Sequence, residues 1–277
     1  MKTIQKLIFV CFCLATIQSY AFKVDTVLTF STAMHKNIKS VIITPDSYQN
    51  GNHFPVLYLL HGYSGNYSSW CNDMAVTKEL VDKYQFIIVC PDGNYSSWYF
   101  DSPLDSTCKN ETYVSKELVN WVDANFKTMK DKRGRAISGL SMGGHGALFL
   151  AFRHQDVFGA CGSMSGGVDI RPFPLNWDIA KRLGDMKTFP ENWEKYTVIN
   201  QLYLLSGSDL KIIFDCGTED FFYDVNLRLH QELLYRNIPH DFISRPGGHK
   251  ASYWNNALKY QALFFADFFA DASKSVE

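Results

Sequence analysis

The sequence predicts an α/β fold built on a mostly parallel central sheet, and three observations support this prediction. Short runs of almost entirely apolar residues recur at 56–60, 86–90, 135–138, 159–164 and 211–215. Such runs are typical of strands buried on both faces, as in a parallel sheet. Segments with helical apolar spacing lie between several runs, and strands that alternate with helices indicate a doubly wound sheet. Two stretches of alternating residues precede the first run and predict an antiparallel hairpin.

The chain begins with the layout of a secretory signal peptide, which we place at 1–21. Two lysines precede an apolar run at 7–17, and the segment ends at Ala21 in a Ser-Tyr-Ala pattern that suits signal peptidase. A membrane anchor is the alternative, but a spanning helix needs about 20 apolar residues. We therefore expect a mature chain, 22–277, that is secreted or periplasmic.

Length and charge restrict the class of protein. Residues 22–277 suit one catalytic domain, because α/β domains often reach about 200–250 residues. The chain has 27 Lys and Arg residues against 28 Asp and Glu residues, and it lacks a basic tract. The electrostatic footprint of a nucleic-acid-binding protein is therefore missing. No segment of the mature chain is long and apolar enough to span a bilayer. We expect neither a nucleic-acid nor a membrane partner, and the sequence does not indicate an oligomeric state.

The hairpin strands and the longer helices can be placed by their periodicity. Alternating stretches at 26–34 and 38–44 predict the two strands of the hairpin. Helices are expected at 113–126 and 222–238, where apolar side chains recur along one stripe at helical spacing, and a last helix at 252–269 is expected to close the chain.

Five of the seven cysteines lie in the mature chain. Cys90, Cys161 and Cys216 sit in or beside apolar runs and are expected to be small buried residues. Cys71 and Cys108 lie in polar, loop-like sequence and could form one disulfide in an exported protein, although the sequence does not give connectivity. No spacing of Cys and His resembles a zinc site, so no metal is expected.

The segment 168–205 interrupts the alternation of strands and helices. It contains three prolines, Trp177 and Trp193, and no clear strand. One interpretation is a surface excursion with an aromatic cluster of its own. The other is a lid-like insertion over a pocket, because long insertions in compact domains are often functional. In the second case Trp177 or Trp193 would contact the substrate.

A catalytic serine is predicted at Ser141. The residues Gly139-Leu140-Ser141-Met142-Gly143 fit the pattern G-x-S-x-G, between the strand-like run 135–138 and a helix-like segment at 144–152. A sharp turn from strand to helix holds a serine hydroxyl above the sheet, at the positive end of the helix. An ordinary serine on a glycine-rich turn is the alternative, but the strand and helix on either side favour a nucleophile.

The serine needs a base, and His249 is the best placed histidine. Proteins with the nucleophile on such a turn carry the acid and then the histidine later in the chain. His249 lies in a flexible Pro-Gly-Gly-His loop after the last expected strand, and catalytic groups gather at the carboxyl ends of parallel strands. The other histidines after Ser141 are expected to be packed, solvated or at the start of a strand: His145, His154, His230 and His240.

The acid and the oxyanion hole follow from the same reasoning. Glu219 and Asp220 both follow the run 211–215, and alternation alone does not separate them; Asp215, within the strand, is expected to be structural. The loop after 56–60 can supply a backbone N–H, which we assign to Tyr63, with His61 fixing the loop. The second N–H would be that of Met142, the residue after the serine.

These motifs resemble those of the esterase D group of the α/β-hydrolase superfamily. The resemblance rests on 60–65, 139–144, 216–220 and Gly248-His249 with Tyr253-Trp254, in that order. The group includes feruloyl esterases, tributyrin esterases and S-formylglutathione hydrolases, with mycolyltransferases as distant relatives. It implies the α/β-hydrolase fold, with Asp220 as the acid, and a serine mechanism that needs no cofactor.

The resemblance also implies substrate-binding residues. The segment from Pro91 to Gly93, with Trp98 and Tyr99, is similar to a family loop that borders the pocket. The segment 168–205 is similar to the lid of feruloyl esterases, and this similarity implies that Trp177 is the aromatic residue that holds a phenolic ring.

Together with the export signal, the resemblance predicts a secreted feruloyl esterase that acts on feruloylated or acetylated plant polysaccharide. A short-chain carboxylesterase, an S-formylglutathione-hydrolase-like thioesterase or an acyltransferase would use the same residues. A hydrolase-fold binding protein is the alternative outside catalysis, but all three members of the triad are present.

Overall fold

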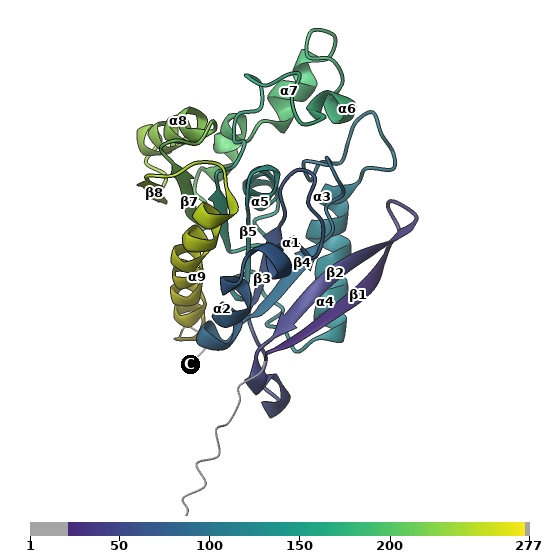
Figure 1. Cartoon of the computed structure of the whole chain (residues 1–277), viewed down its shortest axis with the longest axis vertical. Helices are drawn as coiled ribbons and strands as arrows, with labels where there is room; N and C mark the ends of the chain where they lie inside the picture. The colour runs from purple at the N-terminus through teal and green to yellow at the C-terminus, as the bar shows by residue number, and fades with distance from the viewer. Residues whose placement is uncertain (1–21, 275–277) are drawn as a thin grey trace, which may run out of the picture.

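A computed structural model of the chain describes residues 22–274 as an eight-stranded sheet with helices on both faces (Figure 1). The predicted signal peptide lies outside the described residues. No helix within this part of the chain is long and apolar enough to cross a membrane. The same residues contain no group of three or more His, Cys, Asp or Glu side chains placed to hold a metal ion.

The sheet confirms the predicted class of fold. Its order is β1-β2-β4-β3-β5-β6-β7-β8; β2 pairs antiparallel with β1 and β4, and all other pairs are parallel. The strands are β1 (Lys23–Ser31), β2 (Lys36–Thr44), β3 (Val56–Leu60), β4 (Ile87–Pro91), β5 (Arg135–Gly139), β6 (Ala160–Met164), β7 (Lys211–Gly217) and β8 (Asp241–Arg245). The first strand ends at Ser31 rather than at Met34, because residues 32–35 form the hairpin turn.

The three predicted helices are present, and further short helices join the strands. The α-helices are α1 (Ser69–Asp73), α2 (Val76–Tyr84), α3 (Asn110–Thr112), α4 (Val119–Asn125), α5 (Met142–Arg153), α6 (Ile179–Leu183), α7 (Pro190–Tyr196), α8 (Tyr223–Tyr235) and α9 (Ala251–Lys274). The predicted helix at 113–126 is a composite, with a π-helical stretch η2 (Tyr113–Leu118) between α3 and α4. A 3-10 helix, η4 (Val198–Leu205), precedes β7.

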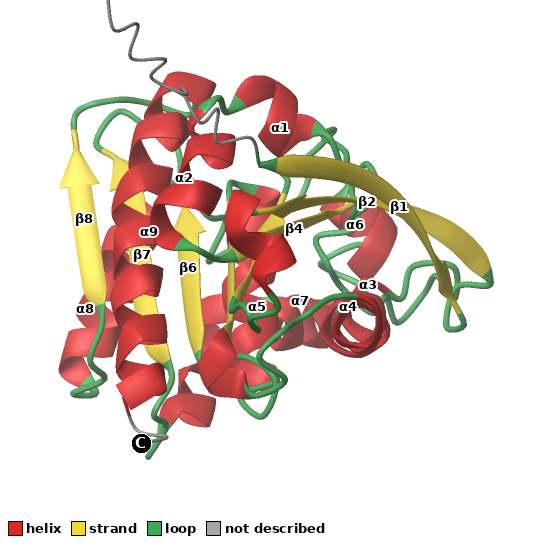
Figure 2. Ribbon diagram, turned by 90° about the horizontal axis from the view of Figure 1, so that it is seen from below, coloured by secondary structure: helices red, strands yellow, loops and turns green. Residues whose placement is uncertain are grey.

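Two hydrophobic cores lie on opposite faces of the sheet. One contains apolar side chains of η2, α4, α5 and α8, and the other contains those of α1, α2 and α9. Figure 2 shows α2 and α9 together on the second face. Every residue of the five strands from β3 to β7 is buried, except Lys211 at the start of β7. Burial on both faces explains the almost continuous apolar sequence of these strands.

The segment 168–205 lies beyond the ends of the strands and carries α6, α7 and η4 (Figure 1). Its apolar side chains join the core on the α5 side of the sheet; among them Trp193 is fully buried and donates a hydrogen bond to the Gly184 carbonyl at 3.0 Å. Arg182 on α6 fixes the segment to the rest of the protein through Asp105, at 2.6 Å, and the Ser96 carbonyl, at 3.1 Å. The segment is therefore a packed cap rather than an extended excursion.

The cysteine pairing considered from the sequence is absent. All five cysteines of the described residues are free thiols. Cys71 packs against the core that contains α2 and α9, whereas Cys108 is buried before α3, where its thiol accepts a hydrogen bond from Asn110 Nδ2 at 3.4 Å. The possible Cys71–Cys108 disulfide is therefore not formed in this structure, and the polar sequence around Cys108 does not leave its side chain at the surface.

Replacement of Gly143 by alanine is expected to destabilise the fold by about 1–3 kcal/mol, the usual cost of forcing extra volume into a packed interior. A Cβ at this position would lie 2.2 Å from the Leu60 carbonyl oxygen, a backbone atom that cannot rotate away. Urea unfolding measures the effect. Gly248→Ala is the matched control, because a Cβ there would meet atoms only at 3.4 Å or more. Equal unfolding midpoints for the two variants would contradict this expectation.

Candidate active site

Ser141 occupies a strained turn between β5 and α5. Its backbone has φ 55° and ψ −118°, a conformation that costs a non-glycine residue about 1–3 kcal/mol. Two hydrogen bonds hold the turn: the Ser141 N–H donates to the Met164 carbonyl at 2.9 Å, and the His145 N–H donates to the Ser141 carbonyl at 3.0 Å. The strain places the hydroxyl directly before the first N–H groups of α5, at the positive end of that helix.

The structure brings Ser141, His249 and Asp220 into one hydrogen-bonded line. His249 Nε2 lies 2.9 Å from Ser141 Oγ, and His249 Nδ1 lies 2.9 Å and 3.0 Å from the two oxygens of Asp220. Because a carboxylate only accepts hydrogen bonds, Nδ1 carries the proton and Nε2 is free to accept the serine hydroxyl. Asp220 is itself fixed by the Phe222 N–H, which donates to Oδ1 at 2.9 Å. This arrangement can activate the hydroxyl as a nucleophile.

The loops that carry Asp220 and His249 are joined beyond the ends of β7 and β8. The Thr218 N–H donates to the Arg245 carbonyl, and the Glu219 N–H donates to the Gly247 carbonyl, both at 2.9 Å. The Glu219 side chain is exposed, and among the described residues its carboxylate has no hydrogen bond to His249. The geometry thus separates the two acids that the alternation of the sequence left open.

A buried ion pair lies under these loops. Asp215 on β7 is fully buried and accepts a hydrogen bond from Arg245 Nη2 on β8. Burial raises the pKa of Asp215 to about 6, and the positive charge of Arg245 opposes part of this rise. The Arg245 guanidinium also lies over the rings of Tyr253, at 5.3 Å, and Tyr260, at 4.4 Å, on α9. Asp215 therefore joins β7 to β8 through Arg245, in agreement with the structural role predicted for it.

The loop after β3 runs past the nucleophile. A side chain added at Gly62 would lie 3.4 Å from Ser141 Cβ, so the backbone of Gly62 and Tyr63 passes close to the serine. Met142, at the start of α5, is fully buried beside it. Tyr63 and Met142, whose backbone N–H groups are the predicted oxyanion-hole donors, therefore both lie beside the serine.

His61 fixes this loop from within. The Gly93 N–H donates to His61 Nε2 at 2.8 Å, so the ring proton is on Nδ1, which donates to the Gly62 carbonyl at 2.8 Å. Burial lowers the pKa of His61, which keeps the ring neutral. The Tyr63 ring packs on Tyr95 with a centroid distance of 4.9 Å, and its hydroxyl donates to Asp178 at 3.4 Å. Contacts from two other loops therefore hold the segment.

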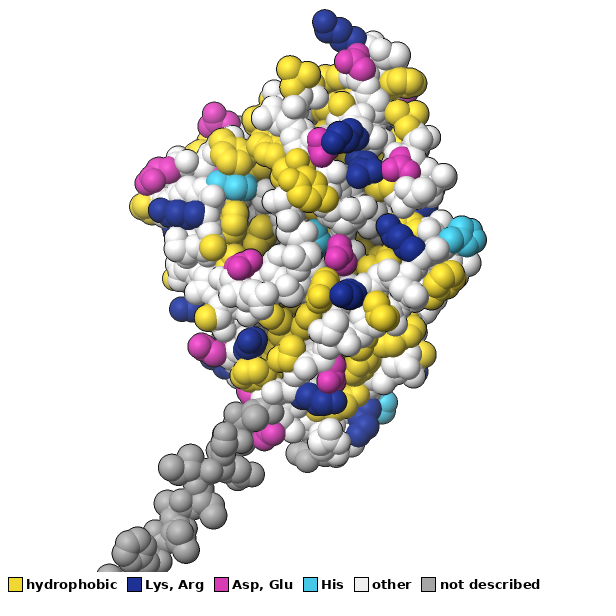
Figure 3. All heavy atoms as spheres, turned by 45° about the vertical axis from the view of Figure 1, so that its right-hand side comes forward, with side chains coloured by type: hydrophobic (Ala, Val, Ile, Leu, Met, Phe, Trp, Pro, Cys, Tyr) yellow, Lys and Arg dark blue, Asp and Glu magenta, His cyan; other side chains and the backbone are white. Residues whose placement is uncertain are grey.

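Ser141 and His249 open into a cleft of about 780 Å³, a size that suits a small organic ligand. Trp177, Phe221 and Trp254 give it an aromatic lining, and Tyr63 borders the serine. Its polar lining comes from Ser64, Asn66, Ser69 and Asp73. The space-filling view in Figure 3 shows charges of both signs scattered over the face that it draws, without an extended area of one sign.

The structure separates the predicted substrate-binding residues into two groups. Trp177 lines the cleft, as the lid interpretation expects. Trp98 and Tyr99 do not reach it: they are 1% and 0% exposed, and Trp98 Nε1 donates to the Trp177 carbonyl at 3.1 Å. Their expected contact with substrate is therefore wrong for this structure, because the cap covers Trp98 and the Tyr99 ring packs against α5. Trp193 also lies in the interior of the cap.

Sequence reasoning missed Phe221, Trp254 and the polar lining of the cleft. Phe221 follows Asp220 directly and is 52% exposed, so an aromatic residue beside the predicted acid was the available signal. Trp254 entered only through the family resemblance, without a role. The polar residues from Ser64 to Asp73 carried no signal, because exposed Ser, Asn and Asp side chains are typical of any loop.

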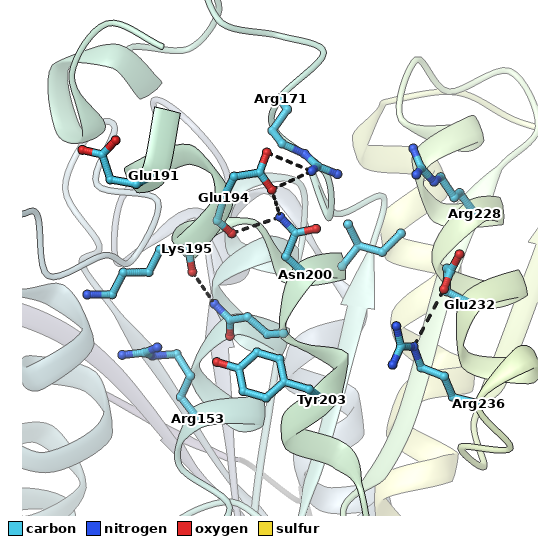
Figure 4. A pocket seen from close by; sticks show the side chains of 12 residues that line it. Arg153, Arg171, Glu191, Glu194, Lys195, Asn200, Tyr203, Arg228, Glu232 and Arg236 are labelled. Atoms are coloured by element: carbon cyan, nitrogen blue, oxygen red, sulfur yellow. Dashed lines mark hydrogen bonds and ion pairs between the residues drawn. The ribbon is translucent and has the colours of Figure 1, made fainter. Parts of the chain in front are cut away.

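A second cleft, of about 790 Å³, lies between the cap and α8 and holds none of the predicted site residues. Figure 4 shows ion pairs among the charged side chains that line it: Arg171 with Glu194, at 2.8 Å, and Arg236 with Glu232, at 3.8 Å. Size alone therefore does not identify the site; the line of Ser141, His249 and Asp220 does.

Comparison with known proteins gives a consistent picture. A family model named Esterase, with the description "Putative esterase", matches residues 31–265. An esterase of Mycobacterium tuberculosis is 30% identical over 239 residues, which are 75% of this chain and 51% of that protein. The chain thus spans about half the length of this curated relative.

Two further matches cover most of both chains. An acetyl esterase of Caldicellulosiruptor saccharolyticus is 27% identical over 214 residues, 73% of this chain and 79% of that protein. The solved structure of a ferulic acid esterase has a TM-score of 0.77 and 29% identity, and the match covers 90% of this chain and 99% of that one.

Proposed function

This chain belongs to the Esterase family, and we propose that it is a secreted serine carboxylic-ester hydrolase. Its proposed substrates are feruloyl or related hydroxycinnamoyl esters of plant cell-wall polysaccharide. The observation that carries the proposal is the hydrogen-bonded line of Ser141, His249 and Asp220 in a cleft with an aromatic lining. Export is proposed from the pattern of the first 21 residues.

The reaction proceeds in two halves. Ser141 Oγ attacks the ester carbonyl carbon while His249 Nε2 takes the hydroxyl proton, and Asp220 balances the charge of the imidazolium. The N–H groups of Tyr63 and Met142 hold the negative oxygen of the tetrahedral intermediate. His249 then gives its proton to the leaving alcohol. In the second half, water attacks the acyl-enzyme with His249 again as the base, and Ser141 is released.

The aromatic lining supports an aromatic acyl group. Trp177 and Phe221 stack with a centroid distance of 5.4 Å and an angle of 20°, beside the predicted nucleophile and base. Flat aromatic groups gain most from offset or edge contacts with such rings. The match to a ferulic acid esterase over nearly all of both chains supports the same substrate class. An acetyl ester is the second candidate, favoured by the match to an acetyl esterase.

Trp177→Ala is expected to lower kcat/KM for methyl ferulate about tenfold, because truncation of a buried aromatic contact typically costs more than 1 kcal/mol. The loss for p-nitrophenyl acetate should be clearly smaller, because an acetyl group is too small to reach the Trp177 ring and loses only the support that Trp177 gives to Phe221. Steady-state kinetics with both esters measure the difference.

Tyr203→Ala is the matched control, because Tyr203 is an exposed aromatic residue of the second cleft. Equal losses for ferulate and acetate in Trp177→Ala would exclude an aromatic acyl pocket at this residue. Strong preference of the unchanged protein for p-nitrophenyl acetate would support the acetyl ester instead.

A further inference from the structure

Three aromatic rings surround the imidazole of His249. The Phe221 ring lies closest, with a centroid distance of 4.2 Å and an angle of 34° between the planes. The Trp254 ring is perpendicular to the imidazole at 4.8 Å, and the Phe222 ring is nearly perpendicular at 5.6 Å. Of the three, Phe221 is the nearest to the imidazole and the least inclined to its plane, whereas the other two meet it edge-on.

The position of Phe221 is fixed although half of its surface is exposed. Its ring stacks on Trp177 of the cap and meets Phe222 at 4.7 Å. Trp177 is held in turn by Trp98, whose Nε1 donates to its carbonyl, and by the Phe173 ring at 5.4 Å. The cap therefore holds the Phe221 ring against His249 although the ring is half exposed, so burial of apolar surface is not the only reason for its position.

The position of the Phe221 ring matters for the reaction because His249 changes its charge. In the proposed reaction the imidazole becomes a cation in each half of the cycle. Asp220 faces Nδ1 and Ser141 faces Nε2, so neither covers the face of the ring. The face of a phenyl ring carries negative charge density and attracts a cation within about 6 Å.

We propose that Phe221 is a positioning residue for the reaction, and that its ring face stabilises the imidazolium of His249 that forms in the transition states. This inference rests on the proposed serine mechanism but not on the identity of the acyl group or the alcohol. It differs from a substrate-binding role, because a residue that acts through His249 affects every ester, whereas a binding residue affects only those esters that touch it.

The sharpest test changes the charge density of the ring while nearly keeping its shape. Phe221 is replaced site-specifically by phenylalanines with one, two or three ring fluorines, and Phe221→Leu and Phe221→Tyr complete the series. The rate of modification of Ser141 by a small fluorophosphonate is measured with the full chain, together with kcat and KM for p-nitrophenyl acetate. The fluorophosphonate reports the Ser141–His249 pair without any acyl preference.

We expect kcat and the maximal modification rate to fall in steps with each fluorine and by about 3- to 30-fold in Phe221→Leu, the range expected for loss of a cation–π contact. KM should stay within about twofold, and Phe221→Tyr should restore most of the rate. The same fluorines at Phe173, which contacts Trp177 and Phe222 and has no ring contact with His249 among the described residues, should change little.

Two results would overturn the inference. If fluorination leaves both rates unchanged while Phe221→Leu lowers them, the ring acts only through its shape. If KM rises and kcat does not fall, Phe221 binds substrate. Failure of the proposed substrate class is recognised separately, since the modification rate would still follow the fluorine series when methyl ferulate is not hydrolysed. If fluorophosphonate does not modify Ser141 at all, the serine mechanism and this inference fail together.

Discussion

Replacement of Ser141 by alanine is expected to lower kcat about 10⁶-fold, to the level left by transition-state binding without a nucleophile. The hydroxyl is the group that His249 Nε2 faces at 2.9 Å, and the variant removes it without changing the strained backbone of the turn. The thermal midpoint and KM should therefore remain close to those of the unchanged protein. Hydrolysis of p-nitrophenyl acetate and labelling by a fluorophosphonate measure the loss.

Ser163→Ala is the matched control for this prediction. Ser163 lies on β6 and is fully buried, and its hydroxyl has no hydrogen bond within the described residues. It also belongs to a second glycine- and serine-rich stretch that resembles the nucleophile motif without fitting it. We expect this variant to keep its activity within about threefold. Substantial hydrolysis by Ser141→Ala would mean that another group is the nucleophile.

Asp220→Asn should lower kcat about 10⁴-fold while preserving the fold, as removal of the acid does in other triads. The carboxylate accepts the Nδ1 proton of His249 and so fixes the tautomer in which Nε2 can accept from the serine. An amide that donates to Nδ1 would hold the opposite tautomer, with a proton on Nε2. Steady-state kinetics across several pH values distinguish this loss from a change in substrate affinity.

Glu219→Gln is the control for the acid, because the two residues are adjacent and their substitutions are chemically equivalent. The exposed Glu219 side chain should be replaceable with less than about a twofold change in kcat. A large loss in Glu219→Gln with full activity in Asp220→Asn would show that the loop adopts another arrangement during the reaction, and the assignment of the acid would have to be reversed.

Local sequence predicts the sheet and the serine well, because their signals are local. The apolar runs mark strands that are buried on both faces, and the turn at Ser141 needs small neighbours within a few residues. The order of the strands is different: β3 lies between β4 and β5, which depends on how the connecting helices pack across the sheet. No local pattern encodes that choice.

The site was predictable to the extent that its residues lie at strand ends. His249 could be selected for this reason, but Asp220 and Glu219 share one turn, and only the turn's conformation decides which side chain faces the histidine. Trp98 and Tyr99 show the opposite difficulty. Their loop has the composition of a pocket border, yet contacts with a segment about 80 residues later bury it. Burial of that kind is a property of the tertiary structure.

The position of β8 has a consequence for thermal inactivation. This strand has a single neighbour, β7, and none of its five residues is buried, yet the loop that follows it supplies His249. Edge elements with few buried contacts open at a lower free energy than the whole domain. The Asp215–Arg245 pair and the contact between the Phe214 and Phe242 rings, at 4.9 Å, oppose this opening. We therefore expect heating to detach β8, and with it His249, before the whole domain unfolds. Activity would then be lost at a lower temperature than the fold.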